Sequence, residues 1–253
     1  MSLHAVDATS TTGMPSQFAV ALTLANGTDH RGFGPQLHLC RVHGLITGLR
    51  ETGWDGDVVC LQHGFAVGGA GMAMLQRLCT HVYSPPLIPF DGGPGGKRAV
   101  EHARAHGRVP PPPGSKVQVR HDAGRTSLKL QAWRLTQYEL VLHTDTDVVF
   151  TESPSGMFAR ALTDGVLFHA QRQWGGRGYW GISSHLMLLR PNADIASILA
   201  ANSASGHFVP YSMTATDVVE SAFPPTVISS AGDGSMIACE YVRVGYVWAS
   251  MKA

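Results

Sequence analysis

Short apolar runs alternate with segments of helical periodicity along most of this chain. Phe18–Leu24, Val58–Leu61 and Leu186–Leu189 are apolar runs of strand length. Apolar residues recur at roughly helical spacing in Leu37–Leu49 and Gly68–Leu78. Apolar strands that alternate with helices are typical of a mainly parallel sheet with helices on both faces. The pattern therefore predicts a single α/β domain.

Further segments extend this pattern towards the C-terminus. The additional expected strands are His81–Ile88, Tyr138–Thr144 and Gly165–Ala170, and the additional expected helices are Ser127–Leu135, Gly156–Leu162, Ile195–Ala201 and Thr216–Ala222. Residues 1–17 are polar and small, and we expect them to be a disordered N-terminal segment. The domain then covers residues 18–253.

One long stretch interrupts the domain. Residues 85–118 contain Pro85-Pro86, a Gly/Pro run at 92–96 and four prolines at 110–113, so regular elements cannot fill the stretch. A short helix at Lys97–His106 is the exception that we expect. Loops of this length in a compact domain are usually functional or disordered, so the excursion is interpreted either as a flexible segment or as a lid.

Composition limits the classes of function. The 253 residues carry a formal net charge of +1, and only 15% of them are charged. No basic stripe is present, which argues against nucleic acid as the main partner. No run is long enough to span a bilayer and the N-terminus is not a signal peptide. We therefore expect a cytoplasmic protein, or else an excised domain of a Golgi protein.

The four cysteines are scattered. No C-x-x-C pair occurs, so a zinc ribbon is excluded, and a disulfide framework is not expected in a chain of this size. Cys40, Cys60 and Cys79 lie in apolar surroundings and are interpreted as small buried hydrophobic residues. The thirteen histidines show no metal-binding motif such as H-E-x-x-H, and His207, the histidine nearest to Asp217, is the best single candidate.

Two carboxylates follow the expected strand Tyr138–Thr144. Asp145 and Asp147 are two positions apart, so in extended backbone both point to one side. Such a pair beside apolar residues is costly unless a cation or a set of donors neutralises it. Taken alone, the spacing fits a divalent metal site and a capping turn about equally. Because ligands bind beyond the carboxyl ends of strands in open α/β sheets, this position favours the metal site.

The block from Gly124 to Asp147 carries a resemblance. It reads GRTSLKLQAWRLTQYELVLHTDTD and is similar to the glycogenin-like family 8 of retaining glycosyltransferases, in which a T-x-x-K-L, an aromatic residue and L-T-x-Y precede a strand that ends in D-x-D. The resemblance implies a nucleotide-diphospho-sugar transferase fold of the GT-A type. It implies a hexosyltransferase that uses a UDP-sugar donor and an unknown sugar or protein acceptor.

The resemblance also implies roles for individual residues. Asp145 and Asp147 would hold Mn²⁺, or Mg²⁺, on the donor diphosphate, and Lys129 would contact the donor near its diphosphate and sugar. Asp217 would face the transferred sugar, either as a nucleophile or as an orienting group. The nucleotide-sugar contacts would also include Leu22, Thr23, Thr146, Ser183 and Ser184.

Three positions depart from the family pattern. Ser183 replaces an Asn, Val218 replaces a Gln, and His185 replaces a Gly, where an imidazole would narrow the sugar pocket. The family's third metal ligand is a C-terminal His, but no His follows Asp217. Either the domain is truncated, or Asp233 or Glu240 substitutes, or the metal is weakly held. The alternative is therefore a catalytically degenerate homologue that binds nucleotide sugar, or a protein partner, without turnover. A nucleotidyltransferase of similar fold is disfavoured because no Gly-rich phosphate loop follows the first strand.

Overall fold

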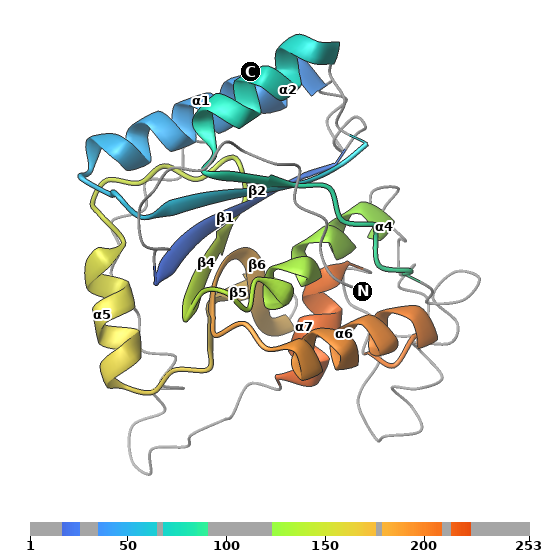
Figure 1. Ribbon diagram of the computed structural model, residues 1–253. Helices are drawn as coiled ribbons and strands as arrows, with labels where there is room; N and C mark the ends of the chain where they lie inside the picture. The colour runs from blue at the N-terminus through green and yellow to red at the C-terminus, as the bar shows by residue number, and fades with distance from the viewer. Residues whose placement is uncertain are drawn as a thin grey trace.

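A six-stranded sheet forms the centre of the molecule, with strand order β3-β2-β1-β4-β6-β5 (Figure 1). The structure, a computed structural model, describes residues 17–25, 35–64, 68–90, 123–175, 179–208 and 214–223. The strands are β1 Phe18–Ala25, β2 Asp57–His63, β3 His81–Tyr83, β4 Leu140–Thr144, β5 Phe168–Gly175 and β6 Tyr179–Leu189. The helices are α1 Pro35–Glu51, α2 Gly68–Leu78, α4 Ala123–Thr126, α5 Ser155–Thr163, α6 Ala193–Ser205, α7 Ala215–Ala222 and the 3₁₀ helix η2 Ser127–Arg134.

The sheet has a parallel half and an antiparallel half. Strands β3, β2, β1 and β4 run parallel to one another. Strands β6 and β5 form an antiparallel pair, and β6 also runs antiparallel to β4. The expected mainly parallel α/β sheet is thus confirmed, with an antiparallel pair added at one edge.

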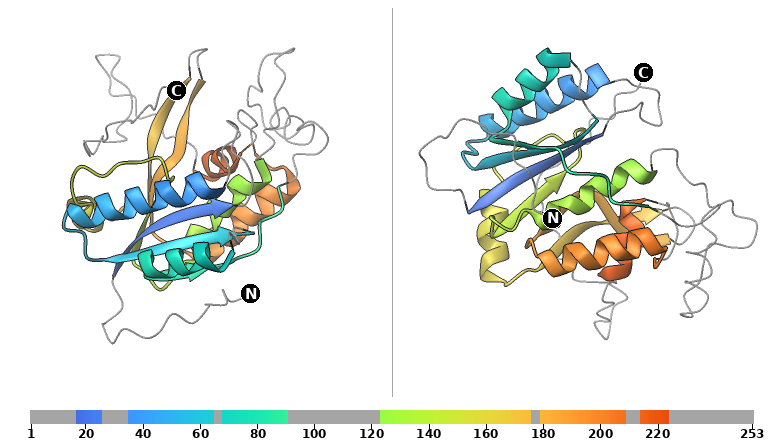
Figure 2. Two further views of the ribbon diagram at one scale, coloured as in Figure 1. Left: turned by 90° about the horizontal axis from the view of Figure 1, so that it is seen from above. Right: turned by 45° about the vertical axis from the view of Figure 1, so that its right-hand side comes forward.

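Side chains of the central strands alternate between two apolar clusters. On β1, Val20, Leu22 and Leu24 pack with residues of α1, α2 and α5. Ala19 and Ala21 point the other way and pack with residues of η2, α6 and α7. Period-2 alternation with apolar residues on both faces requires cover on both sides. The helices therefore form two layers around the sheet, as the two views in Figure 2 show.

Helix η2 positions the segment that precedes β4. The expected helix Ser127–Leu135 is a 3₁₀ helix that ends at Arg134 and follows directly on α4. Ser127 Oγ donates to the Ile88 carbonyl at 2.8 Å, and Gln131 Nε2 donates to the Pro86 carbonyl at 2.7 Å. These bonds fix the first residues of the Pro/Gly-rich excursion against η2.

Some boundaries differ from the sequence-based expectations. Strand β3 ends at Tyr83 rather than Ile88, where Pro85-Pro86 removes two backbone donors. Strand β5 begins later than expected, and β6 begins at Tyr179 rather than Leu186. Residues 91–122, with the expected helix Lys97–His106, lie outside the described residues, as do residues 1–16. None of the described helices has the length and apolarity needed to cross a bilayer.

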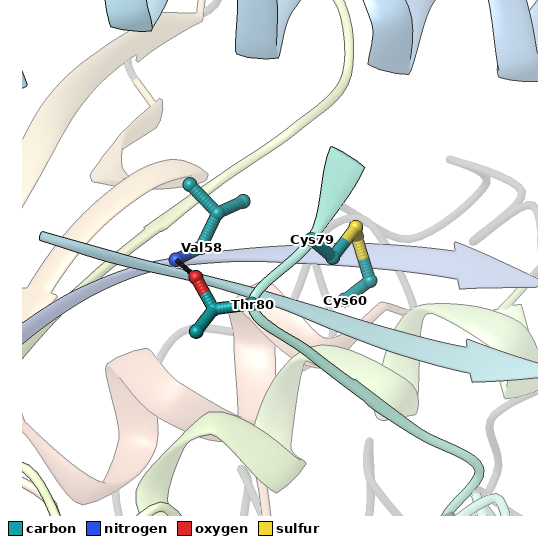
Figure 3. The surroundings of a disulfide bond; sticks show 4 residues. All are labelled: Val58, Cys60, Cys79 and Thr80. Carbon is teal, nitrogen blue, oxygen red and sulfur yellow. Dashed lines mark hydrogen bonds between the residues drawn. A yellow bond between two sulfur atoms is a disulfide. The ribbon is translucent and has the colours of Figure 1, made fainter. Parts of the chain in front are cut away.

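The interpretation of the cysteines was wrong in two respects. Cys60 of β2 and Cys79, just after α2, form a disulfide, with Cα atoms 6.0 Å apart (Figure 3). The reason is the crossover: α2 packs over β2 and delivers the chain to the neighbouring strand β3, so residues 19 apart in sequence meet. Beside the disulfide, the Val58 N–H donates to Thr80 Oγ1 at 3.0 Å. Cys40 is an exposed free cysteine rather than a buried one.

Candidate metal and diphosphate site

The Asp pair lies where the two halves of the sheet meet. Asp145 directly follows β4, which pairs with the parallel strand β1 and the antiparallel strand β6. The Asp145 N–H donates to the His185 carbonyl of β6 at 2.9 Å, which fixes the start of the D-x-D turn to the neighbouring strand. Asp145 is half-buried and Asp147 is exposed. The two carboxylates thus emerge at the carboxyl end of β4, as expected.

The structure adds a third group to the pair. Asp145, Asp147 and His185 each offer a ligand atom, and these three atoms all lie within 4.8 Å of one another. Two carboxylates and an imidazole are donors suited to a divalent transition-metal ion such as Mn²⁺. The donor chemistry and its convergence therefore fit the cation that the sequence led us to expect.

His185 was not predicted as a ligand. It is 38 positions from Asp147 in sequence, so no short local pattern joins the two residues. It reaches the site because β6 runs antiparallel to β4 in a register that pairs Thr144 with Leu186. The available signal was its position in the segment that resembles the family's sugar pocket. Asp233 and Glu240 lie outside the described residues, and His207 follows α6 and is not part of the described group.

Lys129 of η2 contacts the same carboxylate. Its Nζ lies 2.7 Å from Asp145 Oδ1 and donates to Oδ2 at 2.9 Å. It also lies 3.2 Å from Ser184 Oγ and 3.3 Å from the Ser184 carbonyl. Only 12% of the Lys129 side chain is exposed. The structure therefore brings Lys129, Asp145 and Ser184 together, although they come from three different elements.

The charges around Asp145 stabilise its ionised form. Burial raises the pKa of this carboxyl, but the Lys129 ammonium and the close His185 ring outweigh burial and lower the pKa below its ordinary range. The His185 Nδ1 atom lies 2.8 Å from Asp145 Oδ2. A carboxylate that is ionised at neutral pH is the form that a metal ligand requires.

A buried imidazole lies below the site. His143 is two positions before Asp145 on β4 and is completely buried. Burial, together with the nearby Lys129 ammonium, lowers the pKa of His143 to about 3, so the ring is neutral at pH 7. Its Nε2 lies 3.3 Å from Thr23 Oγ1 of β1. Its Nδ1 atom is buried and has no hydrogen-bond partner among the described residues.

The residues expected at the sugar lie on β6 and α7. Ser184 Oγ is 2.7 Å from Thr216 Oγ1, in the first turn of α7. Asp217 is the next residue and is fully buried. Thr214 caps this helix through a bond from the Thr216 N–H at 3.3 Å. A continuous set of contacts therefore leads from Asp145 through Lys129 and Ser184 to the turn that carries Asp217.

The remaining residues that were expected to contact the nucleotide sugar differ in how exposed they are. Thr23 and Thr146 are half-buried near the ends of their strands, whereas Ser183 is buried and its Oγ accepts from the His185 N–H at 3.3 Å. Leu22 is fully buried in the cluster that faces α1. A nucleobase could therefore meet Leu22 only through its backbone.

Comparison with known proteins supports the architecture. A crystal structure of an active-site mutant of LgtC matches with a TM-score of 0.52 at 12% identity, over 81% of this chain and 70% of that one. The galactosyltransferase LgtC in complex with donor and acceptor sugar analogs matches with a TM-score of 0.49 at 12% identity and the same coverage. This chain has the GT-A fold.

Another match is the glycosyltransferase GlyE of Streptococcus pneumoniae TIGR4, with a TM-score of 0.49 at 12% identity, over 84% of this chain and 44% of that one. No family model matches the sequence, and no curated protein is significantly similar to it.

Proposed function

We propose that this chain is a divalent-cation-dependent, retaining glycosyltransferase that transfers a hexose from a UDP-sugar to an acceptor. The observation that carries the proposal is the convergence of Asp145, Asp147 and His185 at the carboxyl end of β4, with Lys129 beside them. The GT-A fold and the similarity of the Gly124–Asp147 block to family 8 support it. The sugar and the acceptor stay open.

Each residue of the site has a part in this reaction. Asp145, Asp147 and His185 would hold Mn²⁺ or Mg²⁺, which supplies Lewis-acid stabilisation of the charge that develops on a diphosphate leaving group. Lys129 adds a second positive charge on the diphosphate side. Departure of the diphosphate leaves positive charge on the sugar carbon, and a nearby carboxylate stabilises such a transition state. Asp217, on the turn joined to Ser184 through Thr216, is the proposed carboxylate.

The direct test is donor hydrolysis, because a glycosyltransferase site usually releases some sugar to water when no acceptor is present. Purified protein is incubated with Mn²⁺ and UDP-glucose or UDP-galactose, and UDP release is measured. The Asp145→Asn variant should lose at least about 100-fold in rate, since the cation contributes several kcal/mol to the transition state. Asp164→Asn, which changes an exposed carboxylate at the end of α5, is the matched control and should retain the parent rate. Equal rates for the parent and the Asp145→Asn variant would contradict the proposal.

A second candidate is a homologue that binds nucleotide sugar without turnover. Two observations favour this alternative. Asp217 is fully buried, and Val218 occupies the position at which the glycogenin-like family has a Gln. The hydrolysis assay separates the two candidates: a binding protein takes up UDP with Mn²⁺ in a calorimetric titration, in a manner that depends on Asp145, but releases no UDP from either donor.

A further inference from the structure

The ammonium of Lys129 contacts the carboxylate of Asp145, which is one of the proposed cation ligands. Both oxygens of Asp145 lie within hydrogen-bond distance of Lys129 Nζ, at 2.7 and 2.9 Å. Asp145 is therefore neutralised within the protein itself, whereas the carboxylate of Asp147 is exposed. A divalent cation that approaches Asp145 meets a fixed positive charge on the same pair of oxygens.

Lys129 has a second set of partners that does not depend on Asp145. Its Nζ also lies 3.2 Å from Ser184 Oγ and 3.3 Å from the Ser184 carbonyl, and Ser184 Oγ is itself held 2.7 Å from Thr216 Oγ1. An ammonium has three hydrogens and these contacts offer four acceptor atoms. Two of the four acceptors thus belong to Ser184 and are independent of Asp145.

We infer that Lys129 is an internal counter-ion that makes cation uptake depend on a diphosphate ligand. Without an anion, Lys129 competes with the cation for Asp145. A diphosphate offers the ammonium a new anionic partner beside the metal group, so Lys129 releases Asp145 while it stays anchored to Ser184. The site therefore binds the cation and the diphosphate as a pair. This inference rests on the proposed function and adds to it the dependence of cation binding on the diphosphate.

Thermodynamic linkage makes the inference measurable. If UDP raises the affinity for Mn²⁺ by some factor, then Mn²⁺ raises the affinity for UDP by the same factor. Removal of the Lys129 charge should strengthen the binding of Mn²⁺ alone, weaken the binding of UDP and reduce the coupling factor. A lysine that serves only to bind phosphate would not restrain the free cation.

The experiment is a Mn²⁺ titration of the full chain with and without UDP, in which electron paramagnetic resonance counts the free ion. Association of Mn²⁺ with UDP in buffer is measured separately and subtracted. For the parent protein we expect UDP to raise the Mn²⁺ affinity by at least about tenfold. Lys129→Met should bind Mn²⁺ alone about tenfold more tightly than the parent. Arg160→Met removes one charge from the exposed face of α5 and should match the parent.

Two results would overturn the inference: equal Mn²⁺ affinity of the parent with and without UDP, or no gain in the affinity of Lys129→Met for Mn²⁺ alone. Circular dichroism checks that each variant folds. Lys129→Gln serves as a second variant, and the measurement on the parent needs no variant. If the parent binds Mn²⁺ but shows no coupling, only this inference fails. If it binds no Mn²⁺ even with UDP, the proposed function fails as well.

Discussion

The parallel and antiparallel halves of the sheet contribute differently to this molecule. The parallel strands β1, β2 and β4 are buried on both faces and form most of the core around the sheet. Strand β6 is antiparallel and carries the polar segment Ser183-Ser184-His185 beside the end of β4. Asp145 and Asp147 come from the parallel half, whereas His185 and Ser184 come from the antiparallel half. The candidate site therefore exists only at the boundary, where the strand direction changes.

This division predicts that stability and cation binding respond to different substitutions. Changes in the core of the parallel half, away from Asp145 and Asp147, should weaken the fold and leave cation binding intact. Changes at the β6 side of the site should weaken cation binding and leave the fold intact.

The largest effect on stability is expected from the disulfide of the parallel half. Replacing Cys60 and Cys79 together with Ala removes the link between two residues that are 19 positions apart, on β2 and just after α2. A loop of this length predicts a loss of about 2–4 kcal/mol in the free energy of unfolding, measured by urea denaturation. Mn²⁺ affinity in the presence of UDP should stay at the parent value. Cys40→Ala removes an exposed free thiol and is the matched control.

The next effect is expected at the antiparallel half. His185→Ala removes the nitrogen donor from β6, and we expect the Mn²⁺ affinity to fall by about 10- to 100-fold, since carboxylates alone leave the ion with fewer protein ligands. The urea midpoint should shift little, because the His185 side chain is 40% exposed. His81→Ala, whose side chain is also 40% exposed and lies at the start of β3, is the control. A large fall in the urea midpoint of His185→Ala with unchanged Mn²⁺ affinity would contradict this expectation, because His185 would then stabilise the fold without binding the cation.

The smallest effect is expected from His143, which lies in the parallel half directly below the site. Its pKa is about 3 in the folded protein against 6.5 as the ordinary value. Between these values the unfolded state binds a proton that the folded state does not, so stability falls as the pH drops from 6.5 towards 3 and is unaffected above 6.5. The slope from this residue is at most about 1.4 kcal/mol per pH unit.

His143→Leu removes this contribution. The free energy of unfolding of the variant should therefore decline less steeply than that of the parent between about pH 6.5 and 4.5. Arg160→Gln, an exposed substitution on α5, should preserve the parent slope. Identical slopes for the parent and His143→Leu would mean that the imidazole is not held neutral by burial.

The same division explains which features the sequence could predict. Strands β1, β2 and β4 are buried on both faces, so their apolar runs stand out within a few residues of their true bounds. The first half of β6 has Gly and Ser among its residues and lacks such a run, which is why only its last residues were predicted. A run of apolar residues indicates that a strand is buried, but it does not indicate which other strand it pairs with.

The candidate site, too, was only partly predictable from the sequence. Asp145, Asp147 and Lys129 belong to one continuous block, and the local pattern and its resemblance identify them. His185 joins them only through the register of β4 against β6, which no spacing in the sequence encodes. The Cys60–Cys79 bond depends in the same way on the crossover from β2 to β3. Both misses are long-range contacts set by strand pairing.

Whether β6 supplies a ligand to the cation is tested most sharply by pulsed electron paramagnetic resonance of Mn²⁺ bound to the protein with UDP, which detects nitrogen bonded to the ion. We expect an imidazole nitrogen signal in the parent that disappears in His185→Gln and persists in His143→Leu. A manganese ion bound with no nitrogen signal, or a signal that survives in His185→Gln, would contradict the claim that the antiparallel strand β6 completes the metal site.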